Sequence, residues 1–191
     1  MGTANQLTLV RLALSPVFIL MFYLGGGAGH VLALAVAILF ETTDLLDGYV
    51  ARNWQQTTDF GKLFDPMADS VARFSVFLCF LWGGYADLWM VALIFYRESM
   101  VAYLRIAAAR SGLVLAARLS GKLKAITQGV VILAVLVLIV LTPADDPFRV
   151  EATKRTAQWL MGLVVLVTLW SGWDYVRSSL PALRGLLRRK P

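Results

Sequence analysis

The sequence has almost none of the residues that disulfides and zinc sites require. Cysteine occurs once, as Cys79, and histidine once, as His30, in 191 residues. A single cysteine cannot form a disulfide within the chain, and the histidine count excludes a histidine-based zinc site. We expect Cys79, which lies in an apolar run, to serve in the core, and His30, which follows a glycine-rich turn, to be an exposed loop residue.

Long polar stretches are also scarce. The chain is 59% hydrophobic and 16% charged, whereas a soluble domain is typically about 45–50% apolar. No polar segment is long enough for a second domain, so we expect one integral membrane domain over residues 1–191. The net charge of +6 would suggest nucleic acid in a soluble protein. Here the bases lie between apolar runs, which favours membrane lipids as partners and no nucleic acid.

Apolar runs predict an all-α bundle of six transmembrane helices. The runs cover about residues 10–25, 30–51, 62–84, 87–108, 121–142 and 156–177. The first is short, and we expect an amphipathic juxtamembrane helix near residues 3–12 to precede it. No basic region or small-residue cleavage site marks a signal peptide, so we interpret the N-terminus as mature sequence. The bases gather in alternate connections, which predicts a multi-pass protein of the inner (cytoplasmic) membrane with both termini in the cytoplasm.

Four carboxylates interrupt the apolar sequence between positions 44 and 69. They are Asp44, Asp47, Asp65 and Asp69. A charge at the centre of a membrane helix costs at least ~2.5–3.5 kcal/mol, so these acids need compensation. Residues three and four apart share a helix face, so two facing helices would bring the acids together for divalent cations. The alternative is pairing with nearby bases such as Arg52 and Arg73, which leaves two phased glycines unexplained.

From Asp44 the sequence reads Asp-x2-Asp-Gly-x2-Ala-Arg-x8-Gly-x3-Asp-x3-Asp. This pattern resembles the full signature of the CDP-alcohol phosphatidyltransferases. The resemblance implies an integral membrane enzyme, a homodimer, that displaces CMP from a CDP-linked lipid with a second alcohol. It also implies two Mg²⁺ or Mn²⁺ ions, the first held by Asp44, Asp47 and Asp65 and the second by Asp44, Asp65 and Asp69. The same resemblance makes Asp69 the general base, and a carboxylate with a free oxygen can accept the proton of a hydroxyl.

The same resemblance implies a set of contacts to the CDP part of the lipid. The residues concerned are Asn5, Thr8, Gly48, Ala51, Arg52, Thr58 and Gly61. Two of them are glycines, which let a ligand approach the backbone, and Arg52 has the planar fork that binds phosphate. Alternatives remain open for the others. Asn5, Thr8 and Arg11 also fit a capped helix start with a snorkelling arginine, and Thr58 fits a helix N-cap.

A second group of bases is predicted to bind the phosphate of the acceptor. It consists of Arg97, Arg105, Lys122 and Lys124. Sequence neighbours point to different helix faces, so we do not expect Arg97 to pair with Glu98, and an intramembrane arginine is a functional candidate. The alternative for the two lysines is topological anchoring. Together with Gln128, these residues look like the pattern of bacterial phosphatidylglycerophosphate synthases. One departure is Ser70, where that subfamily has lysine, and Arg73 is the candidate substitute.

This second resemblance implies the reaction of CDP-diacylglycerol with sn-glycerol 3-phosphate, which gives phosphatidylglycerol phosphate and CMP. Other acceptors remain open: phosphatidylglycerol giving cardiolipin, an inositol phosphate, or serine, which fits least because a zwitterion does not need so many bases. An ion-coupled transporter is a more distant alternative. Such transporters usually show internal repeats and broken helices, and the sequence shows neither.

Overall fold

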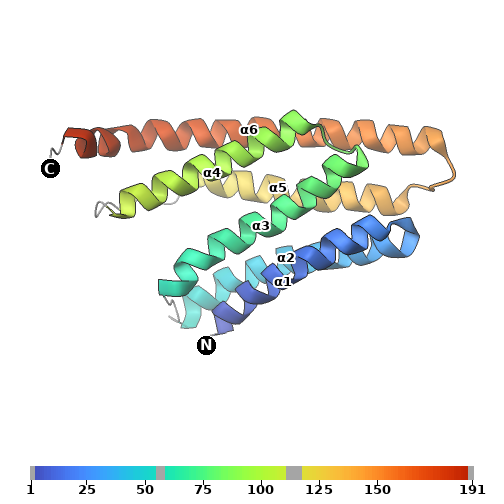
Figure 1. The fold of residues 1–191 in the computed structure, drawn as a ribbon, viewed down its shortest axis with the longest axis horizontal. Coiled ribbons are helices and arrows are strands. Elements are labelled where there is room, and N and C mark those ends of the chain that lie inside the picture. Colours follow the sequence, from blue (N-terminus) through green and yellow to red (C-terminus); the bar gives the residue numbers. More distant parts are fainter. Residues whose placement is uncertain (1–2, 55–58, 111–117, 189–191) are drawn as a thin grey trace. The chain divides into compact units, whose positions relative to one another are not determined.

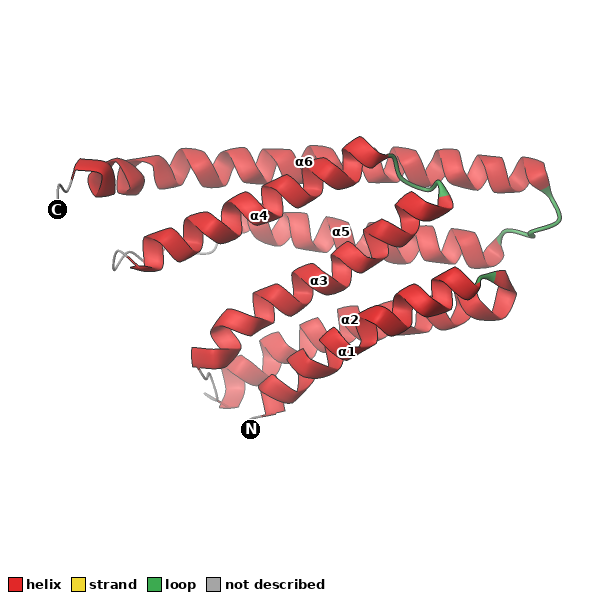
Figure 2. Cartoon of the chain, viewed as in Figure 1, coloured by secondary structure: helices red, strands yellow, loops and turns green. Residues whose placement is uncertain are grey.

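The computed structural model describes residues 3–54, 59–110 and 118–188, and within these ranges it has six helices and no strand (Figures 1 and 2). The all-α prediction is confirmed. The helices are α1 (Thr3–Leu24), α2 (Gly26–Trp54), α3 (Asp59–Gly83), α4 (Leu88–Arg110), α5 (Leu119–Leu141) and α6 (Pro147–Arg188).

Three helices contain stretches that are long and apolar enough to cross a membrane. These stretches are Gly26–Thr43 in α2, Leu119–Leu141 in α5 and Pro147–Leu180 in α6, among the residues that the structure describes. The 23 residues of α5 span about 35 Å, which exceeds the ~30 Å hydrocarbon core of a bilayer. Helices α3 and α4 have 25 and 23 residues, but they also carry the charged residues of the candidate site.

The expected juxtamembrane helix and the first apolar run form a single helix. Helix α1 runs without interruption through Pro16. Proline removes one backbone donor from a helix interior, yet the helical backbone continues on both sides. Residues 3–12 are therefore the first part of α1 rather than a separate element.

His30 does not lie in an exposed loop, so that prediction is wrong. Helix α2 already begins at Gly26, because Gly25 and Gly26, with φ of +64° and +66°, complete the turn after α1. His30 is half-buried in the first turns of α2, and its ring centroid lies 5.4 Å from that of Phe22. The glycines make the turn shorter than the sequence suggests, and the helix therefore extends over His30.

The chain divides into two compact units, which are described in turn. The first contains Met1–Ala86 and Ile132–Gln158. In it α1 packs against both α2 and α3. Phenylalanine rings form much of this core. The ring centroid of Phe18 lies 6.1 Å from that of Phe40 on α2, and the ring centroid of Phe22 lies 6.3 Å from that of Phe80 on α3. Cys79 is buried, as predicted. Helix α1 therefore joins the two helices that carry the acidic motif.

The second unit contains Asp87–Val131 and Trp159–Pro191. It comprises α4, the first half of α5 and most of α6. Its interior includes polar side chains as well as apolar ones: Gln128 on α5 donates a hydrogen bond of 3.3 Å to Thr168 on α6, and both are buried. Large apolar side chains such as Trp173 and Leu166 are instead exposed, as expected for helices that face lipid tails.

Candidate active site

Two helices carry the acidic motif. Asp44, Asp47, Gly48, Ala51 and Arg52 lie in the helical backbone of α2, and Gly61, Asp65 and Asp69 lie in that of α3. The helical spacing that the sequence predicts is therefore present. Of the four carboxylates only Asp69 has a described side chain.

Several other predicted contacts also fall outside the described side chains. They are Asn5, Asp44, Asp47, Gly48, Ala51, Arg52, Gly61 and Asp65, and Thr58 lies outside the described residues altogether. The convergence of the four carboxylates stays a prediction for this reason. No group of three or more His, Cys, Asp or Glu that could hold a metal ion occurs among the described side chains. The chemistry of the predicted set, four carboxylates, fits hard divalent ions.

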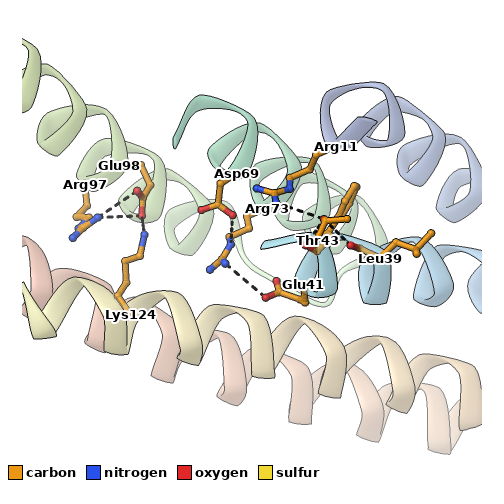
Figure 3. Close-up of polar contacts among 10 residues, drawn as sticks. Arg11, Leu39, Glu41, Thr43, Asp69, Arg73, Arg97, Glu98 and Lys124 are labelled. Carbon is orange, nitrogen blue, oxygen red and sulfur yellow. Dashed lines mark hydrogen bonds and ion pairs between the residues drawn. The ribbon is translucent and has the colours of Figure 1, made fainter. Parts of the chain in front are cut away.

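Arg73 links two acids on different helices of the first unit (Figure 3). Its Nε donates a hydrogen bond of 3.0 Å to Oδ1 of Asp69, and its Nη2 lies 3.7 Å from Oε2 of Glu41 on α2. The Arg73 side chain is 9% exposed and that of Asp69 is 32% exposed. Asp69 is thus oriented by a buried base while it remains accessible.

Arg73 was a candidate from the sequence, whereas Glu41 was not predicted. The available signal was a glutamate inside a predicted span, three residues before Asp44.

Arg11 on α1 reaches the beginning of the acidic motif. Its Nη2 donates to Oγ1 of Thr43 at 3.5 Å, and Thr43 directly precedes Asp44 on α2 (Figure 3). Both Arg11 and Thr8 are buried. This burial contradicts the alternative of a snorkelling arginine, which would place the guanidinium in the lipid headgroup region. Thr8 and Arg11 therefore lie on the face of α1 that packs within the first unit.

A second polar cluster lies in the second unit (Figure 3). Arg97 Nη1 lies 3.3 Å from each carboxylate oxygen of Glu98, and Lys124 on α5 donates to Glu98 Oε1. The expectation that Arg97 and Glu98 would not pair is wrong, because both side chains are long enough to meet beside their own helix. The cluster joins two of the four predicted acceptor-binding bases. Two bases and one acid leave it with a net positive charge.

Helix α6 contributes contacts that were not predicted from the sequence. Ser171 Oγ accepts a hydrogen bond of 2.8 Å from Arg97 Nη2. Asp174 accepts two hydrogen bonds from Arg118, at 2.7 and 2.9 Å, and one of 2.6 Å from Ser120. An aspartate within an apolar run was a signal for such a role, but the sequence offered no means of choosing its partner.

The other two predicted bases are exposed. Arg105 on α4 lies over the ring of Tyr175, with its Cζ 5.5 Å from the ring centroid. Lys122 is exposed in the first turn of α5. The structure therefore brings Arg97 and Lys124 together and leaves Arg105 and Lys122 accessible to a solute.

A family model and individual relatives both match this chain over most of its length. A family model described as CDP-alcohol phosphatidyltransferase matches residues 1–170. A Mycobacterium tuberculosis protein named probable phosphatidylglycerophosphate synthase is 36% identical over 186 residues, which cover 96% of this chain and 84% of that protein.

Two further relatives carry the name CDP-diacylglycerol–glycerol-3-phosphate 3-phosphatidyltransferase. The Bacillus subtilis protein is 33% identical over 192 residues, covering 94% of this chain and 96% of its own length. The Pseudomonas fluorescens protein is 32% identical over 192 residues, covering 96% and 93%. The chain is therefore similar to these proteins over nearly its full length.

Proposed function

Because the chain belongs to the CDP-alcohol phosphatidyltransferase family, we propose that it transfers a phosphatidyl group from CDP-diacylglycerol to sn-glycerol 3-phosphate. The products are CMP and phosphatidylglycerol phosphate, so the enzyme acts in phospholipid biosynthesis. The observation that carries this proposal is the nearly full-length similarity to enzymes named for this reaction. The proposed enzyme is one membrane domain over residues 1–191.

Divalent metal is the proposed cofactor, and the family is generally dependent on it. Asp44, Asp47 and Asp65 would hold one Mg²⁺ or Mn²⁺ ion, and Asp44, Asp65 and Asp69 a second. When bound, such ions neutralise the charge of the pyrophosphate and of the leaving nucleotide. The support from this chain is the donor set itself, since carboxylate oxygens are the ligands that these ions prefer.

Asp69 is the proposed general base. The hydroxyl oxygen of the acceptor forms a bond to the phosphorus that carries diacylglycerol, the bond from this phosphorus to the oxygen of CMP breaks, and the hydroxyl proton passes to Asp69. The 3.0 Å hydrogen bond from Arg73 supports this role, because it fixes one carboxylate oxygen. The partial exposure of Asp69 leaves the group accessible to the acceptor.

The CDP part of the lipid is proposed to lie against the motif residues of α2 and α3 and the N-terminal part of α1. The contacts are Asn5, Thr8, Gly48, Ala51, Arg52, Thr58 and Gly61. The part-buried contact of Arg11 with Thr43 supports the participation of α1, since it ties this helix to the residue next to Asp44.

The acceptor phosphate is proposed to bind Arg97, Arg105, Lys122 and Lys124. The net positive charge of the cluster around Glu98 supports this role, as does the exposure of Arg105 and Lys122. Charge-assisted hydrogen bonds are about twice as strong as neutral ones, which suits a small doubly charged acceptor.

An acceptor panel tests the reaction. Purified protein is supplied with CDP-diacylglycerol and, in separate assays, glycerol 3-phosphate, phosphatidylglycerol, an inositol phosphate or serine, and CMP release is measured. We expect release with glycerol 3-phosphate alone. Preference for another acceptor would overturn the proposed substrate but keep the chemistry. No CMP release with any acceptor would favour the transporter alternative.

The protein is also proposed to lie in the inner membrane with both termini and the active site on the cytoplasmic side. Arg118, Lys122 and Lys124 near the start of α5 support this orientation. Single cysteines at Leu119 and Asp145, both exposed, should react with an impermeant reagent from opposite sides in a Cys79→Ala background. Labelling of both from one side would contradict a membrane-spanning α5. A homodimer is proposed from the family resemblance.

A further inference from the structure

One turn of α6, residues 171–175, contacts two bases of α4 and the base that directly precedes α5. Ser171 and Gly172 lie against Arg97, Asp174 binds Arg118, and Tyr175 lies under Arg105. The family model ends its match at residue 170, so this turn lies just beyond the matched sequence. Residues 171–175 themselves belong neither to the acidic motif nor to the basic pattern.

Arg97 occupies a close-fitting place on this turn. The guanidinium donates to the Ser171 hydroxyl at 2.8 Å, and the exposed fractions are 7% for Arg97 and 0% for Ser171. A Cβ added at Gly172 would lie 2.9 Å from Cγ of Arg97 and 3.7 Å from its Nε. Because Cγ is near the root of the side chain, Arg97 cannot avoid such a group by moving its tip alone. The glycine therefore allows the stem of Arg97 to lie against α6.

Asp174 fixes the start of α5. Two hydrogen bonds, of 2.7 and 2.9 Å, join its carboxylate to the guanidinium of Arg118, and a third of 2.6 Å comes from Ser120. Bidentate pairs of this kind fix direction as well as distance. Ser120 is two residues before Lys122 and four before Lys124, so the first turn of α5 is held at the point where it presents these lysines.

Tyr175 completes the turn. Its ring lies 5.5 Å from the Cζ of Arg105, a distance at which a guanidinium is attracted to the face of an aromatic ring. Arg105 remains exposed, and so the ring constrains its stem and orientation while its hydrogen-bond donors stay available. Every predicted acceptor-binding base is thus in contact with this turn, or lies on the first turns of α5 that the turn fixes.

We propose that residues 171–175 of α6 form a positioning segment for the acceptor phosphate. Ser171 and Gly172 place Arg97, Tyr175 places Arg105, and Asp174 places the start of α5 with Lys122 and Lys124. The segment itself does not contact the acceptor. This inference rests on the proposed function, because it assumes that the four bases bind a phosphorylated alcohol.

Alanine at Gly172 provides the sharpest test, and the same helix provides a matched control. Gly162 lies ten residues earlier, and a Cβ added there would meet nothing within 4 Å. We expect Gly172→Ala to raise the KM for glycerol 3-phosphate about tenfold, which corresponds to the loss of roughly one charge-assisted contact. The KM for CDP-diacylglycerol and the kcat at saturating acceptor should stay within about twofold of the wild type. Gly162→Ala should match the wild type in all three constants.

Ser171→Ala gives a second measurement that does not require a larger side chain to fit. It removes the hydroxyl that accepts from Arg97, and the acceptor KM should rise while the KM for CDP-diacylglycerol does not. The effect should disappear in an Arg97→Ala background, because a residue that acts through Arg97 has nothing left to position. Equal effects of Ser171→Ala in both backgrounds would overturn the proposal.

The two proposals can fail separately. If the wild type prefers another phosphorylated acceptor, the proposed substrate is wrong, and the same variants are then compared by the KM for that acceptor. If glycerol 3-phosphate is the substrate but Gly172→Ala behaves like Gly162→Ala, the positioning segment is wrong. A fall in kcat with both KM values unchanged in Ser171→Ala would also overturn it.

Discussion

Arg73 holds Asp69 from one helical turn further along α3, with 3.0 Å between Nε and Oδ1. Nη2 of the same guanidinium lies 3.7 Å from Oε2 of Glu41 on α2. Glu41 therefore helps to fix Arg73, which in turn orients Asp69. A second arginine–acid pair with the same four-residue spacing, Arg155 with Glu151, is solvent-exposed, at 74% and 59%. Comparing substitutions in the two pairs therefore separates the effect of orienting Asp69 from the effect of losing a surface ion pair.

Arg73→Ala should lower kcat by about one to two decades. The hydrogen bond to a charged group contributes ~1.5–3 kcal/mol, and each 1.4 kcal/mol corresponds to a factor of ten. CMP release at saturating substrates measures the effect. Arg155→Ala is the control and should be neutral, because exposed ion pairs contribute about 0–1 kcal/mol. Equal activity of the two variants would show that Arg73 does not orient Asp69.

Asp69→Asn should lower turnover by about 10²–10⁴-fold while binding of CDP-diacylglycerol largely survives. The amide keeps the size of the carboxylate but cannot accept the proton, and general base catalysis contributes about 10²–10⁴-fold. Binding of labelled CDP-diacylglycerol and CMP release should be measured on the same preparation. Near-normal turnover would assign the base to another group.

Removal of divalent ions should stop the reaction completely. With excess EDTA we expect no CMP release, and Mg²⁺ or Mn²⁺ should restore it, because carboxylates alone would repel the pyrophosphate. Asp44→Asn should lower activity by orders of magnitude and still insert into membranes, since loss of an intramembrane charge makes insertion easier. Full activity in the chelator would refute the two-ion proposal.

Replacement of an exposed acceptor base should affect one substrate only. Arg105→Ala or Lys122→Ala should raise the KM for glycerol 3-phosphate by roughly one to two decades, as expected for the loss of a charge-assisted contact. The KM for CDP-diacylglycerol should hardly change. Arg149 is a suitable control, because it is exposed and pairs locally with Asp146 at 3.3 Å. If Arg105 and Lys122 variants match Arg149→Ala, these bases are topological anchors.

Much of the candidate site is visible in the sequence because it follows from local rules. The spacing of the four aspartates matches the turn of a helix, and the structure shows α2 and α3 helical through these positions. The limits of the glycine turn were predicted less well. His30 falls inside α2, because positive φ at Gly25 and Gly26 completes the turn within two residues.

By itself, the sequence determined the helices, the acidic motif and the need of each intramembrane charge for a partner. Apolar runs and helical spacing act over a few residues. A charged side chain within an apolar run is costly unless it is paired, whatever the partner is. Only the tertiary structure decided which partners meet. Glu98 joins Arg97 beside it to Lys124, and Ser171 reaches Arg97 across 74 residues of sequence. Long side chains can reach several candidates, and the choice among them is made by the way the helices pack.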